Sequence, residues 1–177
     1  MNIINEKVVE YLDTTYKSPS KELELLRKEA EANRVPIILR DSEAFLLTLL
    51  KTIDAKNILE IGTAVGYSSS CFVCASGAEV VTIEADEETY NIACDNIKKL
   101  KYDDKITPLL GDARQVLENM QDENKDKFDF VFIKLSDNTE ENPRLPLTIL
   151  KKHMKAPAKF KGTRSFIFNG NEAKVFD

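Results

Sequence analysis

A turn punctuated by glycines is the first feature of the sequence that could bind a ligand. The segment NILEIGTAVGYSSS, residues 57–70, runs from an apolar stretch through Gly62 and Gly66 into a series of small residues. Glycine lacks a Cβ, so a turn with two glycines lets the backbone approach a bound molecule closely. The lysine of a Walker phosphate-binding loop is absent, so the pattern does not predict that kind of site.

Two glutamates flank this turn in the sequence. Glu60 precedes Gly62 by two residues, and Glu84 follows Gly62 by 22 residues. A carboxylate at the end of a neighbouring strand can accept hydrogen bonds from both hydroxyls of a ribose. The dinucleotide pattern G-x-G-x-x-G is absent, and the charge of Glu60 would disfavour a pyrophosphate but favour a cationic sulfonium. The residues therefore favour S-adenosylmethionine (SAM) as the ligand.

A regular alternation of strand and helix patterns positions these residues. Short links join the elements, which predicts a parallel sheet with helices on both faces. Ligands bind beyond the carboxyl ends of the strands in such a sheet. The glycine turn, Glu84 and the segment Gly111-Asp112-Ala113 should therefore meet at one edge. We expect strands over residues 57–62, 79–85, 105–111 and 127–133, and helices over residues 67–76, 86–100 and 112–121.

Three helical stretches precede the first strand. Ser20 is the expected N-cap of the second helix, and Asp41 or Ser42 of the third. We expect residues 1–54 to pack as N-terminal helices on a domain of residues 55–177, in one structural unit. The stretches cover residues 5–13, 19–34 and 41–53; their apolar faces comprise Leu23, Leu26 and Ala30 in the second and Phe45, Leu46, Leu49, Leu50 and Ile53 in the third.

Four segments in this order resemble the SAM-dependent O-methyltransferase family that includes catechol and caffeoyl-CoA methyltransferases. The resemblance covers roughly residues 5–133 and is nearest to bacterial members that methylate a hydroxyl of the tRNA wobble uridine. It implies a Rossmann-like SAM methyltransferase fold and O-methylation of a small-molecule or tRNA hydroxyl. The segments are ILEIGTAVGYSSS, VVTIEADEETYNIACDNI, ITPLLGDARQVL and FDFVFI.

The resemblance also implies a role for each residue of the cofactor site. Thr63, Tyr67 and Ser68 would line the pocket, with Ser68 bonding the methionine carboxylate, although ordinary helix packing explains Tyr67 and Ser68 equally well. Glu84 would bind the ribose hydroxyls. Three residues would shape the pocket for the methionine end of SAM: Glu60, Gly62 and Gly66. Two residues would border the adenine: Asp112 and Ala113.

A lysine departs from the family pattern at the end of the fourth strand. Family members usually carry a metal-binding Asp there, in a FIDA motif, whereas this chain reads Phe132-Ile133-Lys134-Leu135. An ammonium group cannot coordinate Mg²⁺ and would repel it, so we expect no divalent metal. Lys134 could act instead as a fixed positive charge or, with a lowered pKa, as a base. The plainer alternative is an exposed lysine in a SAM-binding or regulatory member without activity.

The C-terminal segment departs from the family pattern as well. The stretch RSFIFNGNEAKVF predicts an antiparallel hairpin around Asn169-Gly170. In the alignment that we prefer, this stretch is the closing hairpin of the fold and residues 147–160 are its last helix. In the other, residues 144–157 follow the fourth strand as a helix and the hairpin's first strand becomes the fifth. Either way a helix–strand unit of about 30 residues is missing, so we expect a truncated sheet.

Composition and charge indicate where the protein resides and which partners it can bind. The net charge is −5, and no apolar run approaches the roughly 18 residues of a membrane span. The acidic N-terminus does not read as a signal peptide, so we expect a cytoplasmic protein with no membrane partner. Residues 144–177 carry 8 basic and 2 acidic side chains, which could contact tRNA phosphates, although a solvated surface is the simpler explanation. Family analogy suggests a homodimer through the N-terminal helices.

Overall fold

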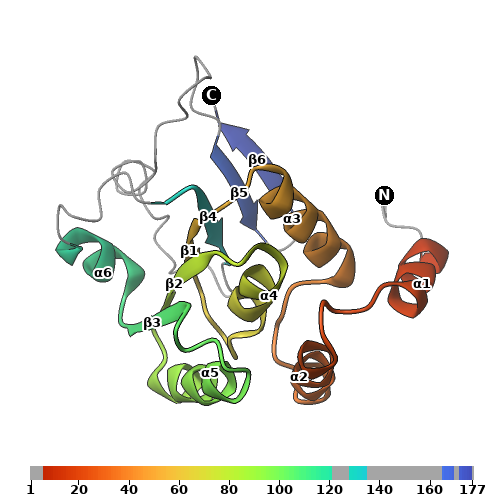
Figure 1. Ribbon diagram of the computed structural model, residues 1–177, viewed down its shortest axis with the longest axis horizontal. Coiled ribbons are helices and arrows are strands. Elements are labelled where there is room, and N and C mark those ends of the chain that lie inside the picture. Colours follow the sequence, from red (N-terminus) through yellow and green to blue (C-terminus); the bar gives the residue numbers. More distant parts are fainter. Residues whose placement is uncertain (1–5, 121–127, 135–164, 170–171, 177) are drawn as a thin grey trace.

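The computed structural model describes residues 6–120, 128–134, 165–169 and 172–176 of the chain (Figure 1). The helix that we expected within residues 144–160 lies outside these residues, and so does most of the basic segment. Among the described helices, none is both long and apolar enough to cross a membrane.

A four-stranded parallel sheet forms the centre of the molecule, as the alternation predicted. Its strand order is β3-β2-β1-β4. The chain therefore builds the sheet outward from β1 to β3 and then returns to the other side of β1. In sheets of this kind ligands bind beyond the carboxyl ends of the strands, next to the point where the strand order reverses, which here lies between β1 and β4. The strands are β1 (Asn57–Ile61), β2 (Glu79–Glu84), β3 (Ile106–Leu110) and β4 (Phe130–Ile133).

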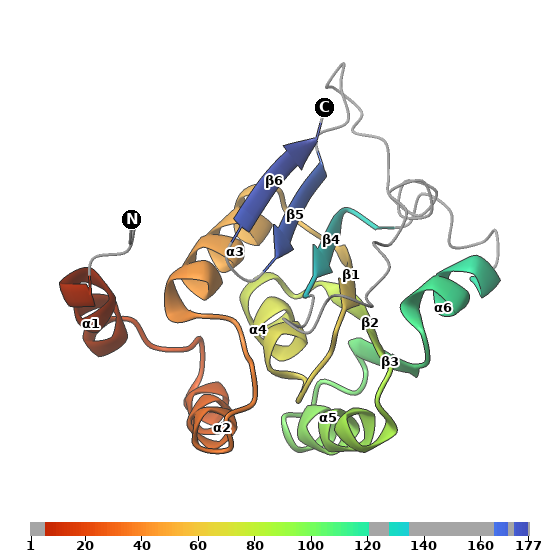
Figure 2. The ribbon, with the colours of Figure 1, turned by 180° about the vertical axis from the view of Figure 1, so that it is seen from behind.

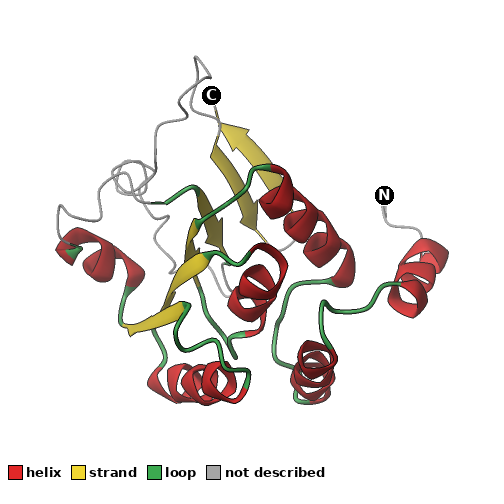
Figure 3. Cartoon of the chain, viewed as in Figure 1, coloured by secondary structure: helices red, strands yellow, loops and turns green. Residues whose placement is uncertain are grey.

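Helices cover both faces of this sheet, which confirms the predicted α/β class (Figure 3). Successive strand residues point to opposite faces. Ile58 accordingly packs with α4 (Tyr67–Ser76) and α5 (Glu87–Lys99), whereas Leu59 packs with Leu117 of α6 (Ala113–Asn119). Each predicted strand and helix of residues 57–133 is found within a few residues of its expected bounds.

Three helices precede the sheet: α1 (Glu6–Thr15), α2 (Lys21–Ala32) and α3 (Arg40–Thr52). Ser20 caps α2 as predicted, because its side chain accepts a hydrogen bond from the amide of Leu23. The predicted cap of α3 is wrong. The helix begins at Arg40, and Leu39 stands at the cap position without a side-chain hydrogen bond. Asp41 instead accepts the amide of its neighbour Ser42 at 2.6 Å.

The buried face of α3 is turned relative to the predicted one. Phe45 and Ile53 are about half exposed, while Glu43 is fully buried. Leu46 and Leu50 lie in the core as expected, in the same apolar cluster as Leu23. Because the buried side of α3 includes Glu43, it is not the purely apolar face that the sequence predicted.

The predicted C-terminal hairpin is present as a separate two-stranded antiparallel sheet. It consists of β5 (Ser165–Asn169) and β6 (Glu172–Phe176), with Asn169 opposite Glu172. The hairpin lies beside β4 in both views of the molecule (Figures 1 and 2). The parallel sheet itself keeps four strands among the described residues, in agreement with the expected truncation.

Candidate functional site

The glycine turn after β1 is set by contact between two strand ends. Gly62 has a positive φ of 92°, and its amide donates to the carbonyl of Ile83 at 2.9 Å. A Cβ at Gly62 would lie 2.7 Å from the backbone oxygen of Lys134. Lys134 in turn donates its amide to the carbonyl of Ile61 at 2.8 Å. Glycine is therefore required here by the approach of β4 to β1, whatever binds above it.

Gly66 closes the turn and begins α4. Its φ is 77°, and a Cβ there would lie 3.3 Å from the side chain of Ile97 on α5. The hydroxyl of Ser70 donates to the carbonyl of Gly66 at 2.6 Å. On the turn itself, the carbonyl of Val65 accepts from the side-chain amide of Asn96 at 3.0 Å. Contacts with α5 thus fix the second half of the turn.

Glu60 lies beneath the turn, with no exposed surface. Its carboxylate accepts hydrogen bonds from the hydroxyl of Ser68 at 2.5 Å and from that of Thr82 at 2.6 Å. Thr82 gives its proton to Glu60, so the 2.7 Å contact between the hydroxyls of Thr63 and Thr82 has Thr63 as donor. Burial raises the pKa of Glu60 to about 7. The carboxyl therefore carries less negative charge near neutral pH than the sequence argument assumed.

All three predicted lining residues have their hydroxyls engaged elsewhere, that of Thr63 with Thr82. The proton of Ser68 goes to Glu60, so Ser68 cannot donate it to a methionine carboxylate while that bond holds. Tyr67 is 1% exposed, and its hydroxyl donates to Glu43 of α3 at 2.7 Å. The first turn of α4 directs Tyr67 toward the N-terminal helices. The geometry favours the packing explanation for Tyr67, and we leave it out of the proposed cofactor pocket.

Glu84 ends β2 directly beside the turn, as expected. One carboxylate oxygen accepts the amide of Ala64 at 2.9 Å; the other accepts the amides of Ala85 and Asp86 at 2.9 and 3.2 Å. A carboxylate offers about four acceptor sites, so one remains for a ligand hydroxyl beside the turn, whereas the sequence analysis expected bonds from both hydroxyls of a ribose. The amide of Gly111 donates to the carbonyl of Glu84 at 2.8 Å, which brings the end of β3 to the same edge.

Asp112 and Ala113 lie at that edge with a structural role that the sequence analysis missed. Asp112 caps α6, because its carboxylate accepts the amides of Arg114 and Gln115 at 3.0 and 3.1 Å. Ala113 is the first residue of α6 and packs against the apolar cluster around Leu117. The signal was available in the sequence, since Asp before a helical run is a preferred N-cap. Their predicted contact with an adenine stays a prediction.

Lys134 is partly buried, so the alternative of a fully exposed lysine does not hold. Burial lowers the pKa of its ammonium, and the carboxylates of Glu60 and Glu84 oppose that effect. Lys134 therefore lies within electrostatic reach of both acids of the site. Among the described residues no three candidate metal ligands cluster, and an ammonium stands where the family pattern has an Asp; the absence of a divalent metal stays a prediction.

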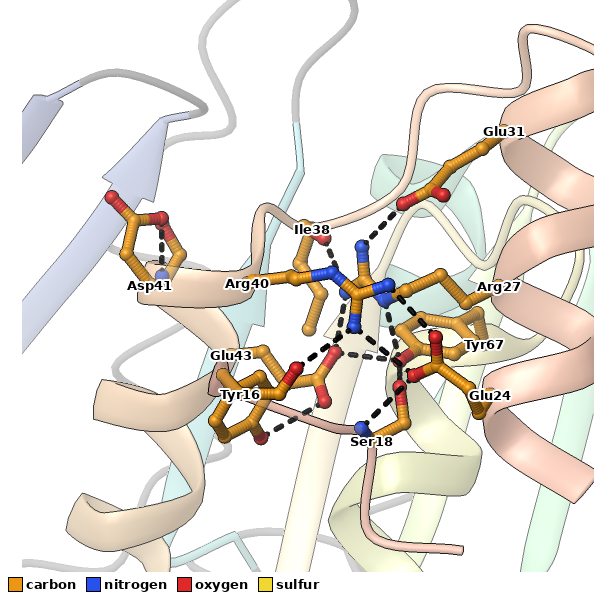
Figure 4. A network of polar contacts seen from close by, with 11 residues as sticks. Tyr16, Ser18, Glu24, Arg27, Glu31, Ile38, Arg40, Asp41, Glu43 and Tyr67 are labelled. Atoms are coloured by element: carbon orange, nitrogen blue, oxygen red, sulfur yellow. Dashed lines mark hydrogen bonds and ion pairs between the residues drawn. The ribbon is translucent and has the colours of Figure 1, made fainter. Parts of the chain in front are cut away.

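A buried polar network joins the N-terminal helices to α4, and the sequence analysis missed it (Figure 4). Arg27 of α2 is 2% exposed and forms an ion pair with Glu43 of α3 at 2.5 Å. A signal was present, because Arg27 lies on the apolar stripe of α2 with Leu23 and Ala30, where a charge needs a buried partner.

The fold and the glycine turn define a Rossmann-like SAM methyltransferase domain. The sequence profile described as O-methyltransferase matches residues 13–143, and the chain therefore belongs to the O-methyltransferase family. Tapetum-specific methyltransferase 1 of Arabidopsis thaliana is 31% identical over 141 residues, which cover 73% of this chain and 59% of that protein. Caffeoyl-CoA O-methyltransferase of Medicago sativa is 34% identical over 97 residues, covering 52% of this chain and 39% of that protein.

Solved structures agree with this assignment. The O-methyltransferase from Bacillus cereus, in complex with S-adenosylhomocysteine (SAH), superimposes with a TM-score of 0.71 at 29% identity. The match covers 92% of this chain and 71% of that one. By contrast, the chain spans about 40–60% of the length of the curated relatives it matches.

Proposed function

We propose that this protein binds SAM at the carboxyl edge of β1, β2 and β3 and transfers its methyl group to a hydroxyl oxygen. Membership of the O-methyltransferase family supports the proposal. One contact carries it: the Glu84 carboxylate accepts the amide of Ala64 at 2.9 Å. This bond holds the proposed ribose-binding acid directly against the turn, at the carboxyl edge of the sheet where ligands bind in folds of this kind.

Lys134 is the residue that we propose to act on the acceptor. SAM supplies an electrophilic methyl group. The neutral Nζ of Lys134 takes the proton of the acceptor hydroxyl, and the oxygen forms its new bond to the methyl carbon. The electrons of the broken carbon–sulfur bond stay on sulfur, so the products are SAH and a methyl ether. Burial, which lowers the pKa of Lys134, favours the neutral amine that this step needs.

Calorimetric titration with SAM and SAH tests the binding half of the proposal. We expect micromolar binding that Mg²⁺ does not change. Glu84→Ala should weaken it about 10- to 100-fold, because hydrogen bonds to a charged group contribute about 1.5–3 kcal/mol. Glu79→Ala is the matched control, since it removes the same charge from the exposed opposite end of β2. Absence of binding to the wild type would contradict the proposal.

Turnover tests the catalytic half. Caffeoyl-CoA and a simple catechol are suitable acceptors, because relatives of this chain carry caffeoyl-CoA in their names. Lys134→Met should abolish SAH formation and leave SAH affinity intact. Unchanged turnover in Lys134→Met would overturn the role of the lysine. Cofactor binding without turnover on any acceptor would favour the alternative, a SAM-binding or regulatory member without activity.

The acceptor, the assembly and the location are further proposals. A tRNA hydroxyl is a candidate acceptor, and RNA binding that weakens steeply with salt would support it. A homodimer through the N-terminal helices is supported by the exposed side chains of Leu25, Leu39 and Phe45, and sedimentation velocity tests it. A cytoplasmic location is proposed from the sequence alone.

A further inference from the structure

The hydroxyl of Tyr67 is the centre of the buried network (Figure 4). It donates its single proton to Glu43 at 2.7 Å. Its oxygen therefore accepts the two remaining bonds, from Nε of Arg27 at 2.9 Å and from the hydroxyl of Ser18 at 2.6 Å. The linker after α1, helix α2 and helix α3 thus all reach the first residue of α4 through one oxygen atom.

Two opposite charges surround this hydroxyl. Nη2 of Arg27 donates to Glu43 at 2.5 Å and to the carbonyl of Ile38 at 2.8 Å, and the guanidinium lies 4.7 Å from the ring centroid of Tyr67. The second oxygen of Glu43 accepts the hydroxyl of Tyr16 at 3.0 Å. Because a buried charge is costly whenever a partner is missing, the network is stable only when all these elements are docked together.

The position of Tyr67 links this network to the glycine turn. Tyr67 follows Gly66 directly, so the network holds the α4 end of the turn, while the contact of Gly62 with Lys134 holds the β1 end. A shift of α2 would move Tyr67 and, through one peptide bond, Gly66. The backbone of the turn, and with it the Ala64 amide that bonds Glu84, depends on the docking of a helix outside the sheet.

We propose that Tyr67, Arg27 and Glu43 are positioning residues for the cofactor turn, so that docking of α2 and cofactor binding strengthen each other. The inference rests on the proposed binding of SAM beside this turn. Coupling between two sites is reciprocal: a docked α2 raises cofactor affinity, and a bound cofactor raises the stability of docking by the same factor. Tyr67→Phe keeps the ring but removes the shared oxygen, and it should weaken SAH binding about 5- to 20-fold.

Hydrogen exchange of the α2 amides, with and without saturating SAH, tests the coupling. In the wild type, SAH should slow exchange in α2 more than in the buried strand β1, whose core amides report global stabilisation. In Tyr67→Phe, SAH should protect residues 62–66 but give α2 no extra protection. Ser18→Ala removes one donor to the same hydroxyl without unpairing a charge, and it should give an intermediate loss.

Glu24→Gln is the matched control. It weakens another contact between α2 and α3, the ion pair with Arg40 at 2.9 Å, while its amide oxygen can still accept the backbone amide of Ser18, which bonds Glu24 at 3.1 Å. It should leave the extra protection of α2 by SAH intact. Extra protection of α2 in Tyr67→Phe equal to that in the wild type would overturn the inference, as would unchanged SAH affinity. A wild type that binds no SAH would instead contradict the proposed function.

Discussion

Glu60 gives the site a measurable dependence on pH. Its pKa is raised from 4.5 to about 7, mainly by burial. Between pH 4.5 and 7 the folded protein therefore keeps a proton on Glu60 that the unfolded chain has released. Stability contributed by this group is therefore complete below pH 4.5 and is lost as pH rises toward 7, by about 3 kcal/mol at 1.36 kcal/mol per unit. Glu60→Gln stays neutral and should lack this loss.

Urea unfolding between pH 5 and 8 measures the difference between Glu60→Gln and the wild type. Glu24→Gln is a suitable control, because the ion pair with Arg40 lowers the pKa of Glu24 to about 2. Stability from Glu24 is lost only as pH falls from about 4.5 toward 2, outside the window. Parallel profiles for Glu60→Gln and the wild type would show that Glu60 does not change its protonation on folding.

Gly62 should be the most restrictive position of the turn. Gly62→Ala places a methyl group 2.7 Å from the backbone oxygen of Lys134 at a φ of 92°. The backbone conformation alone costs about 1–2 kcal/mol, and the clash with backbone adds to it, so we expect a loss of more than about 2 kcal/mol and weaker SAH binding.

Gly77→Ala separates the cost of the backbone conformation from the cost of the steric clash. Gly77 has a φ of 69° at the end of α4, and a Cβ there meets nothing within 4 Å. Gly77→Ala should therefore cost only the backbone part, about 1–2 kcal/mol, and should leave SAH affinity unchanged. Equal losses in the two variants, measured by urea unfolding, would mean that β1 and β4 relax around the added methyl group.

The sequence could identify backbone positions in this site better than side-chain directions. The requirement for glycine follows from turn geometry, so Gly62 and Gly66 were predictable from the strand–turn–helix pattern alone. The direction of Tyr67 was not, because it depends on a charge pair contributed by two other helices. The sequence likewise identified Lys134 as a departure from the family, but its partial burial depends on how β4 meets β1.

One fully buried ion pair, between Arg27 and Glu43, joins α2 to α3. Arg27→Met leaves Glu43 without its charged partner at a fully buried site, which should cost about 3–5 kcal/mol in unfolding free energy. The double variant Arg27→Met/Glu43→Leu removes both charges, and it should recover at least half of that loss. Urea denaturation measures both. A double variant that is less stable than Arg27→Met would contradict this account of the pair.

The helices and strands with the most regular hydrophobic patterns were the easiest to predict. Strands and helices between residues 57 and 133 follow simple periods of two and 3.6, and the structure confirms them. Helix α3 was found where it was expected, but only part of its predicted face is buried, because Glu43 occupies a buried position that a hydrophobic pattern assigns to an apolar residue. Its start was misjudged too, since Asp and Ser look like caps even where tertiary contacts begin the helix earlier.

At the scale of the whole molecule, one core connects the N-terminal helices to the sheet. Leu23 of α2, Leu46 of α3 and Phe72 of α4 belong to the same buried cluster as Phe132 of β4, and the rings of Phe72 and Phe132 meet edge to face at 5.4 Å. Helices that share a core with the sheet should unfold with it. We therefore expect residues 6–54 and the sheet to unfold in one transition, in line with the single structural unit expected from the sequence.

Two spectroscopic probes can test this cooperativity. The chain has no Trp and five Tyr. Tyr16 and Tyr67 lie in the network and Tyr11 lies in α1, so tyrosine fluorescence is weighted toward the N-terminal helices, whereas far-UV circular dichroism reports all elements. We expect coincident urea transitions. SAH at 100 times its Kd should stabilise both by about 2.7 kcal/mol. A fluorescence change at lower urea than the dichroism change would mean that the N-terminal helices undock before the sheet unfolds. In that case SAH would shift the fluorescence transition only if docking of these helices and cofactor binding are coupled.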